Sequence, residues 1–485
     1  MAERMLKFTK LERAMPEKRA VPARAQDFHE IYADFIDAKA TQQASRCSQC
    51  GVPFCQTHCP LHNNIPDWLR MTAEGRIREA YDLAQATSAM PEVCGRICPQ
   101  DRLCEGNCVI EQSGHGTVTI GAVERYLTDK AWEEGWVAPL RPLHELEQSI
   151  GIVGAGPAGL AAADLLRSRG YQVTVYDRHD RAGGLLIYGI PNFKLEKDVV
   201  ERRTARLADG GVEFKLGFEV GRDASLQELR SRHDAVLIAT GVYKPRELSA
   251  PGVGSQGVVA ALDYLIASNR TGLGDTVPEY ESGELNAEGK DVVVVGGGDT
   301  AMDCVRTAVR QGARSVTCLY RRDRANMPGS MREVSHAEEE GVVFEWLAAP
   351  RSVAGDASRV EGVRAARMRL GAADASGRQA PEEIPGADFD LPAQMVIKAL
   401  GFDPEDTPAL FGAPELKVSR WGTIRTDFRT LMTSIDGVFA AGDIVRGASL
   451  VVWGLRDGRD AADSIDAWLR ASAEAARRPA LVAAE

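Results

Sequence analysis

The sequence lacks any long apolar run. Its longest apolar stretches, at residues 235–240 and 292–295, have the length of single strands, whereas a membrane-spanning helix needs about 20 apolar residues. The first ten residues also lack the apolar core of a signal peptide. We therefore expect neither a membrane span nor a targeting segment, and we predict a cytoplasmic location.

Positive charge is also scarce. Lysine and arginine number 58 against 69 aspartates and glutamates, so the net charge is −11. Nucleic acid binding requires a basic surface that neutralises phosphates, and this balance argues against it. Moderate negative charge also serves solubility alone.

Cysteine is nearly absent from most of the chain. Eight of the ten cysteines lie between positions 47 and 108, and only Cys304 and Cys318 lie beyond. Structural disulfides are rare in a reducing compartment, so this crowding indicates bound metal or iron–sulfur clusters. Cys304 and Cys318 fall in a predicted helix and a predicted strand, where we interpret them as small buried hydrophobes.

The cysteine spacing favours clusters over zinc. The first group has gaps of two, four and three residues, and the second has gaps of three, five and three. Eight thiolates match two 4Fe-4S clusters, whereas zinc sites favour paired two-residue gaps and only one such gap occurs here. The predicted metal ligands are Cys47, Cys50, Cys55, Cys59, Cys94, Cys98, Cys104 and Cys108.

Proline follows two of these cysteines, as it does in bacterial ferredoxins, where the cysteine after a three-residue gap binds the other cluster. By that logic Cys47, Cys50 and Cys55 bind one cluster, which Cys108 could complete. Cys59 binds the second, together with Cys98 and Cys104. Cys94 is the weakest of the eight, because an oxygen ligand such as Glu124 could take its place.

Helical patterning surrounds the cysteines, with apolar residues at helical intervals in residues 28–36 and 68–81. From residue 149 the pattern changes to strand, glycine turn, helix and strand. The same order recurs from residue 291. Two such units indicate two dinucleotide sites or one duplicated fold.

The first glycine turn contains Gly154, Gly156 and Gly159 between a predicted strand and a predicted helix. These glycines permit a tight turn, close approach of a pyrophosphate, and close packing of helix on strand. Asp177 ends the next strand, where an acid can accept hydrogen bonds from ribose hydroxyls. The turn alone does not separate FAD from NAD.

Two later strands resolve this choice. One ends in Ala-Thr240-Gly241 and the other in Gly442-Asp443. Both resemble signatures of the two-dinucleotide-binding flavoproteins, the superfamily of glutathione and thioredoxin reductases. The resemblance implies that Asp443 binds the ribityl and phosphate region of FAD, although alone it could be a helix cap.

The second turn predicts an NADPH site. Ala301 stands where the third glycine would be, which the fingerprint allows. The following strand ends in Arg321 and Arg322 with no acid, and guanidinium groups there can bind the 2′-phosphate of NADP. Alternatively, these arginines form a solvated face, and Arg324 or Arg332 binds the phosphate. The residues predicted to bind NADPH are Gly296, Gly298, Asp299, Thr300, Ala301, Arg321 and Arg322.

A flavin can join these parts chemically. NADPH delivers two electrons as hydride, clusters accept one electron at a time, and FAD converts between them. Hydride transfer between cofactors requires no nucleophile or general base, so we predict no catalytic side chain. Disulfide reductases of the superfamily use Cys-x-x-Cys beside the flavin, and neither dinucleotide unit here contains one.

Over nearly its full length the chain resembles the small (β) subunits of NADPH-dependent glutamate synthase. The resemblance rests on the cysteine region, both glycine turns, residues 184–191 beginning at Gly184, residues 320–323 with Met327-Pro, and residues 441–443. Related modules form the front half of dihydropyrimidine dehydrogenase and the flavin subunits of NADPH–ferredoxin oxidoreductases. One cluster of the dehydrogenase has a glutamine ligand, and Glu124 looks like the matching position.

The resemblance implies a large (α) subunit carrying FMN and a 3Fe-4S cluster. Together the chains would convert L-glutamine, 2-oxoglutarate and NADPH into two L-glutamates. Two alternatives remain: a related flavoprotein serving ferredoxin or another acceptor, and a zinc-stabilised scaffold without activity. The predicted fold is α/β, with two Rossmann-like dinucleotide-binding domains, as in glutathione reductase, after an α-helical iron–sulfur domain. The predicted domains are residues 1–145 for two 4Fe-4S clusters, 146–250 and 406–485 for FAD, and 251–405 for NADPH.

Overall fold

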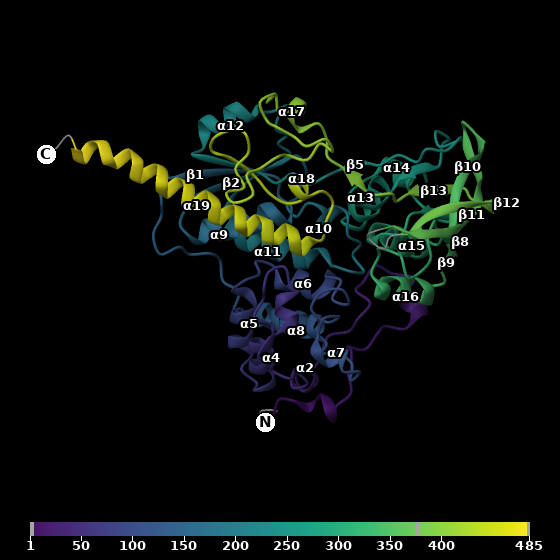
Figure 1. Cartoon of the computed structure of the whole chain (residues 1–485), viewed down its shortest axis with the longest axis horizontal. Helices are drawn as coiled ribbons and strands as arrows, with labels where there is room; N and C mark the ends of the chain where they lie inside the picture. Colours follow the sequence, from purple (N-terminus) through teal and green to yellow (C-terminus); the bar gives the residue numbers. More distant parts are fainter. Residues whose placement is uncertain (1–3, 375–378, 483–485) are drawn as a thin grey trace.

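The computed structural model describes residues 4–374 and 379–482. A helical lobe comes first, and two α/β units follow, each built on a five-stranded parallel sheet (Figure 1). The two units lie side by side above the lobe in this view. The predicted fold class is confirmed, and we retain the predicted boundaries at residues 145, 250 and 405 as a proposal.

A buried tryptophan lies in the core of the helical lobe. Trp68 is fully buried, and its indole Nε1 donates to Asn63 Oδ1 at 2.8 Å. Residues 68–81, which the pattern predicts as helical, form parts of two helices, because Gly75 adopts a φ of 79° between them. The elements are η1 (Lys7–Thr9), α1 (Val21–Arg24), α2 (Asp37–Ala44), α3 (Phe54–Thr57), α4 (Ile65–Ala73), α5 (Ile77–Gln85), α6 (Pro91–Ile97), α7 (Val109–Gln112) and α8 (Ile120–Glu133).

Residues 28–36 are not helical, which corrects the expectation from their apolar spacing. The segment is extended, and Tyr32 forms an isolated antiparallel bridge with Lys18. Phe35 packs in the core of the lobe, while the Tyr32 hydroxyl reaches His336 of the second unit at 2.9 Å. An extended chain can contact several units at once, whereas a helix would turn its apolar side chains to one face.

The first unit has the strand order β15-β4-β1-β2-β3, with every neighbouring pair parallel. The chain leaves this sheet after β4 and returns to it at β15. The strands are β1 (Ser149–Val153), β2 (Gln172–Asp177), β3 (Glu213–Leu216), β4 (Ala235–Ile238) and β15 (Val438–Ala440). The helices are α9 (Pro157–Ser168), α10 (Leu185–Tyr188), α11 (Lys197–Asp209), α12 (Leu226–Arg232), α17 (Thr407–Leu410), α18 (Asp443–Arg446) and α19 (Val451–Val482).

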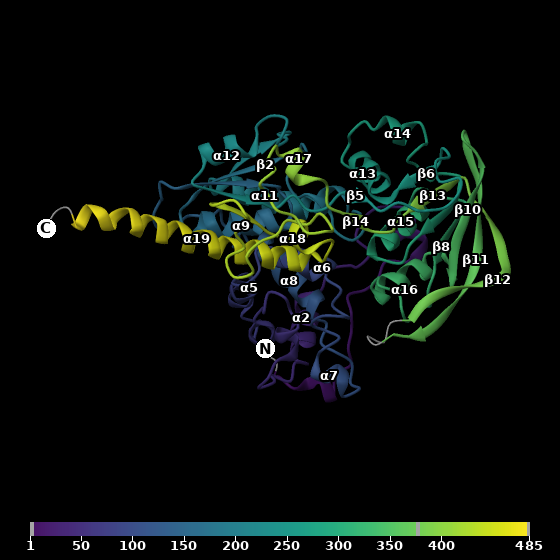
Figure 2. The ribbon, with the colours of Figure 1, turned by 45° about the horizontal axis from the view of Figure 1, so that its top comes forward.

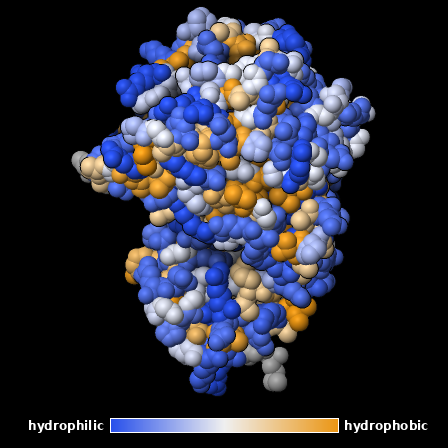
Figure 3. All heavy atoms as spheres, turned by 90° about the vertical axis from the view of Figure 1, so that its right-hand side faces the viewer, coloured by the Kyte–Doolittle hydropathy of each residue, from blue (hydrophilic) through white to orange (hydrophobic). Residues whose placement is uncertain are grey.

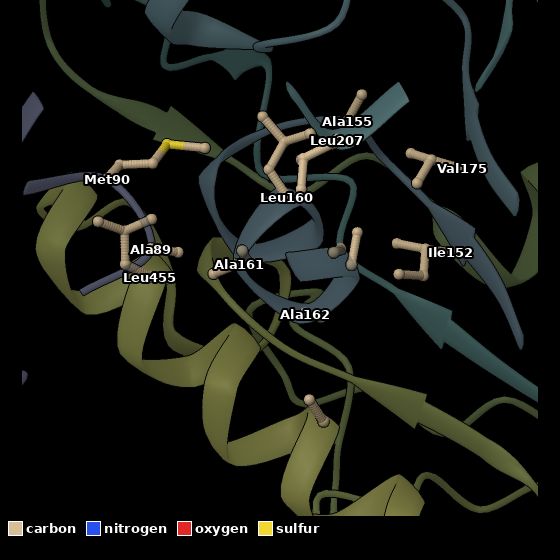
Figure 4. Close-up of a cluster of buried hydrophobic side chains, with 14 of the residues drawn as sticks. Ala89, Met90, Ile152, Ala155, Leu160, Ala161, Ala162, Val175, Leu207 and Leu455 are labelled. Atoms are coloured by element: carbon tan, nitrogen blue, oxygen red, sulfur yellow. The ribbon is translucent and has the colours of Figure 1, made fainter. Parts of the chain in front are cut away.

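Helix α9 lies between the sheet and α19 (Figure 4). Leu160 and Ala161 of α9, Ile152 of β1 and Leu455 of α19 belong to one buried cluster. The two helices approach so closely that a Cβ on Gly458 would lie 2.0 Å from the carbonyl oxygen of Ala158. Beyond this contact, the backbone of α19 extends away from the body in both ribbon views (Figures 1 and 2).

The second unit has the strand order β6-β13-β7-β8-β9, also parallel throughout. An antiparallel three-stranded sheet extends from its outer side (Figure 2), and the face seen from that side is mostly hydrophilic (Figure 3). The strands are β6 (Val258–Ala260), β7 (Asp291–Val295), β8 (Ser315–Tyr320), β9 (Val343–Trp346), β10 (Ala348–Asp356), β11 (Arg359–Ala373), β12 (Gln379–Pro392) and β13 (Met395–Lys398). The helices are α13 (Ala261–Gly272), α14 (Pro278–Glu281), α15 (Asp299–Arg310) and α16 (Met331–Glu339).

The chain crosses between the units twice, and the two crossings pair as β5 (Lys244–Pro245) and β14 (Phe402–Asp403). Among the described residues, no helix combines the length and the apolar character needed to span a membrane.

Candidate flavin, nucleotide and iron–sulfur sites

The first glycine turn connects β1 to α9. Gly154 has a φ of 113°, and a Cβ there would lie 2.4 Å from the carbonyl oxygen of Ala239. A Cβ on Gly159 would lie 1.9 Å from the oxygen of Gly154, so both positions require glycine. Gly184, on a second loop, has a φ of 54°, and a Cβ there would lie 2.9 Å from the Cα of Gly156. This close approach keeps side chains away from the predicted phosphate position at the start of α9.

Asp177 ends β2 as predicted, and its carboxylate fixes the turn. Oδ2 accepts a hydrogen bond from the backbone N–H of Ala155 at 2.7 Å, and Oδ1 accepts one from His179 at 2.8 Å. Carboxylate oxygens can accept further bonds. Its contact with a ribose therefore stays a prediction.

A cavity of about 70 Å³, here called the nucleotide cavity, opens beside this turn. Gly154, Asp177, Thr240 and Gly241 line it, as the sequence motifs lead one to expect. Three further residues that no sequence motif indicates also line the cavity, namely Arg178, Tyr243 and Glu405. The Arg178 guanidinium lies 4.8 Å from the centre of the Tyr243 ring and forms an ion pair with Glu405 at 3.1 Å. Glu405 lies some 230 residues away in sequence, so no local pattern could reveal it.

Asp443 begins α18 directly after Gly442, whose φ is 78°. Burial raises the pKa of Asp443 to about 7. The structure therefore keeps a carboxyl group at a site that disfavours its charge, which is typical of groups with a binding role.

The second glycine turn repeats the geometry of the first. Gly296 has a φ of 149°, and a Cβ there would lie 2.2 Å from the carbonyl oxygen of Ala399. Gly298 precedes α15, which begins with Asp299, and Ala301 is fully buried. Asp299 Oδ1 accepts a hydrogen bond from the N–H of Ser330 at 2.9 Å. Asp299, which is predicted to bind NADPH, therefore also accepts a hydrogen bond from the loop before α16.

The four arginines proposed to bind the 2′-phosphate differ in the partners that they have in the structure. Arg324 pairs with Glu338 at 2.9 Å. The Arg332 guanidinium donates to Gln100 and to the carbonyl oxygen of Cys98, in the helical lobe. Arg321 is exposed after β8, and within residues 4–374 and 379–482 no ion pair engages it or Arg322. These two arginines are therefore the better placed to meet a phosphate.

The eight crowded cysteines divide between two cavities. Cys47, Cys50, Cys55 and Cys108 line cavity A. A different set lines cavity B, which is formed by Cys59, Cys94, Cys98, Cys104 and Glu124. This is the crossed grouping that the spacing predicts, although their role as ligands stays a prediction.

Burial raises the pKa of Cys47 to about 11 and the pKa values of Cys55 and Cys59 to about 12. Alone, these groups would be neutral thiols, and bound iron favours the thiolate. A ring of buried and half-buried cysteines around a cavity therefore fits a 4Fe-4S cluster. Burial also raises the pKa of Glu124, whose carboxylate is the fifth candidate ligand in cavity B. Cys304 and Cys318 are fully buried elsewhere, in α15 and β8.

A cavity of about 240 Å³ lies where the lobe and both units meet, and we call it the central cavity. Leu185 and Leu450 of the first unit line it together with Asp299 of the second. Cys98 and Val452 line both this cavity and cavity B. Ile120 in turn lines both cavity B and cavity A. The three cavities therefore adjoin in series, each sharing part of its wall with the next.

Comparison with known proteins agrees with this architecture. Residues 24–136 match the family of dihydropyrimidine dehydrogenase domain II, 4Fe-4S cluster, and residues 148–475 match the pyridine nucleotide-disulphide oxidoreductases. The chain is 66% identical to the glutamate synthase (NADPH) small chain of Azospirillum brasilense over 483 residues, covering 100% of this chain and 99% of that one. It is 46% identical to the Escherichia coli protein of the same name over 475 residues, covering 97% and 100%.

A longer E. coli protein, the putative oxidoreductase AegA, is 46% identical over 94% of this chain and 70% of its own length. Among solved structures, the Mycobacterium tuberculosis protein FprA in complex with NADPH aligns with a TM-score of 0.57 at 22% identity. That alignment covers 69% of this chain and 86% of FprA. At this identity the likeness concerns the fold.

Proposed function

This chain belongs to the family of glutamate synthase (NADPH) small chains, and we propose that it is the electron-input subunit of such an enzyme. It is an oxidoreductase whose cofactors are FAD, NADPH and iron–sulfur clusters of the 4Fe-4S type. The observation that carries the proposal is the series of three cavities, in which Cys98 lines both the central cavity and cavity B.

When bound, the flavin converts a two-electron hydride into single electrons. The residues of the first unit would hold it: Gly154, Gly156 and Gly184 give the pyrophosphate access to the start of α9, and Asp443 would meet the ribityl and phosphate region. In the second unit, the start of α15 would hold the NADPH pyrophosphate, with Arg321 and Arg322 at the 2′-phosphate. The nicotinamide would then enter the central cavity from the side of Asp299 and Thr300.

The shared walls support an order for the two clusters. The cluster in cavity B would be nearer the flavin, because Cys98 separates that cavity from the central cavity. The cluster in cavity A would be farther away. Exposed Val52 and Phe54 lie beside the cysteines of cavity A, with 66% and 41% of their surface accessible. Electrons would leave the chain through this end.

The proposal also assigns the partner chain that accepts the electrons. We assign as acceptor a large (α) subunit carrying FMN and a 3Fe-4S cluster, which makes L-glutamate from L-glutamine and 2-oxoglutarate. The names of the close relatives support a two-chain enzyme. We also retain a cytoplasmic location as part of the proposal.

Purification under reducing conditions with the native partner tests this function. We expect a large chain to co-purify, NADPH oxidation to depend on L-glutamine and 2-oxoglutarate, and about eight iron and eight sulfide per small chain. A flavin-containing preparation that oxidises NADPH with ferredoxin, and shows no dependence on glutamine, would instead support the second candidate. The similarity of this chain to part of the longer oxidoreductase AegA favours that alternative, because it shows the same module in another chain.

A further inference from the structure

Five polar side chains form a row along the wall of the central cavity. Lys194 Nζ donates to Asp303 Oδ1 at 2.7 Å and lies 3.9 Å from Glu333 Oε2. Glu333 Oε1 is 3.3 Å from His336 Nδ1, and His336 Nε2 is 2.9 Å from the Tyr32 hydroxyl. Two hydrogen bonds, from Lys194 to Asp303 and between Tyr32 and His336, therefore alternate with two ion-pair contacts of Glu333, with Lys194 and with His336.

The row joins all three parts of the molecule. Lys194 comes from the loop between α10 and α11, Asp303 from α15, and Glu333 and His336 from α16. Asp303, Glu333 and His336 are all more than nine-tenths buried. Tyr32 lies on the extended N-terminal segment and is partly exposed, so the row ends near solvent. Burying so many ionisable groups is costly, and neither dinucleotide turn uses these side chains.

The proposed function creates a need for such a row. Oxidation of NADPH to NADP⁺ by one-electron acceptors yields two electrons and one proton, because the hydride carries both. The electrons leave through the lobe, and one proton per NADPH remains in the central cavity. When the flavin and the nicotinamide fill that cavity, as the proposed function requires, the proton needs a route past them to water.

We propose that Asp303, Lys194, Glu333, His336 and Tyr32 form this proton route, from the central cavity to the N-terminal segment. The inference rests on the proposed function, since it requires hydride to enter and single electrons to leave. No atom is left over: NADPH becomes NADP⁺, two electrons pass to the acceptor, and the proton moves along the row to solvent.

Against the effect of burial, Asp303 and Glu333 raise the pKa of Lys194, and Lys194 and Arg306 lower the pKa of Glu333. Asp303 and His336 are therefore the members of the row that exchange the proton near neutral pH. Burial raises the pKa of Asp303 to about 6, against the opposing effect of Lys194. Burial lowers the pKa of His336, which leaves the imidazole neutral and able to accept a proton at neutral pH. The charged groups that face His336 are Glu333 on its own helix, Arg306 on α15, and Lys18 on the N-terminal segment. Those that face Asp303 are Lys194, Glu333 and Asp299.

Two assays on the flavin-loaded chain separate this role from a structural one. Transfer of hydride from NADPH to thio-NADP⁺ returns the hydride and releases no proton, whereas reduction of ferricyanide by NADPH releases one proton per NADPH. For Tyr32→Phe and His336→Asn, we expect the ratio of ferricyanide reduction to hydride exchange to fall about a hundredfold, at the low end of proton-transfer effects. Tyr171→Phe is the matched control, because its hydroxyl donates to Asp466 and neither residue lines the central cavity.

Proton release itself gives a readout independent of turnover. In a single turnover followed with a pH indicator, proton appearance should lag behind electron transfer in Tyr32→Phe and should not lag in Tyr171→Phe. A ratio and a lag equal to those of the control would overturn the proton route. A natural chain that binds no flavin, or exchanges no hydride, would instead refute the proposed function and not the route alone.

Discussion

Cys55 and Cys59 are four residues apart in sequence, yet they line different cavities. Cys55 lines cavity A together with Cys47, Cys50 and Cys108, whereas Cys59 lines cavity B. The short helix α3 (Phe54–Thr57) and the turn after it separate the two side chains. One cysteine motif therefore contributes to two sites, and this arrangement brings the two sites close together.

Replacing these two cysteines should remove different clusters. We expect Cys55→Ser to lose the cluster of cavity A and Cys59→Ser that of cavity B, with about four of eight iron lost in each case. Iron and sulfide analysis, combined with electron paramagnetic resonance of the reduced chains, measures this. Cys318→Ser is the control, since Cys318 is a free thiol in β8 that lines neither cavity. Identical residual spectra from the two cluster variants would contradict the crossed grouping.

Glu124 should matter more than Cys94 for the cluster of cavity B. Both line that cavity, but Glu124 is a buried carboxylate to which no side chain in the described part of the chain donates a hydrogen bond. An unpaired buried carboxylate is costly unless a metal compensates it. We expect Glu124→Ala to lose about four iron, and Cys94→Ala to keep them. Iron analysis giving the reverse pattern would assign the ligand to Cys94.

Removal of the two arginines after β8 should weaken discrimination between NADPH and NADH. Arg321→Ala with Arg322→Ala removes the cations predicted to bind the 2′-phosphate, a group that NADH lacks. The Michaelis constant for NADPH should rise at least about tenfold, as expected for a lost charge-assisted contact, while that for NADH changes little. Arg324→Ala serves as the control because Glu338 already pairs with that guanidinium. Equal effects on both nucleotides would exclude the phosphate role.

Lys197 should make stability depend on pH. Burial lowers its pKa from 10.5 to about 7, and its ammonium group donates to the carbonyl oxygens of Leu186 and Ile190. Between these two pKa values the unfolded chain binds more protons than the folded one, so this group adds stability as pH rises through that window. The stability of Lys197→Met relative to the natural chain should therefore be greatest below about pH 7 and should decline toward about pH 10.

Urea unfolding of both chains across this range measures the difference. The other titrating groups are common to both chains and cancel. A stability difference that is constant with pH would show that Lys197 does not titrate in this range.

Local motifs anticipated much of the site. The glycines of both turns and the cysteine sets follow from backbone geometry and ligand spacing, which short sequences encode directly. Residues 28–36 were predicted wrongly from local pattern. Their apolar spacing suits a helix, but the chain is extended because Phe35 packs in the lobe while Tyr32 contacts His336 of the second unit. Glu405 in the nucleotide cavity and the row from Asp303 to Tyr32 combine distant parts of the chain. Such groupings arise only from tertiary packing.

Arg332 illustrates the same limit. Its position near Arg321 suggested phosphate binding, yet α16 turns its side chain toward Gln100 in the lobe. The sequence places Arg332 close to Arg321, but it does not give the direction in which the Arg332 side chain points. That direction depends on how the lobe packs against the second unit.

The most direct test of the account is anaerobic reduction of Cys104→Ser by NADPH, followed by flavin absorbance and electron paramagnetic resonance. Cys104 lines cavity B and not cavity A, so this variant should lose the cluster between the flavin and cavity A. We predict that NADPH still reduces the flavin while the cluster of cavity A stays oxidised, in contrast to the natural chain, where both are reduced. Equally fast reduction of the cluster of cavity A in the variant would contradict the ordered path.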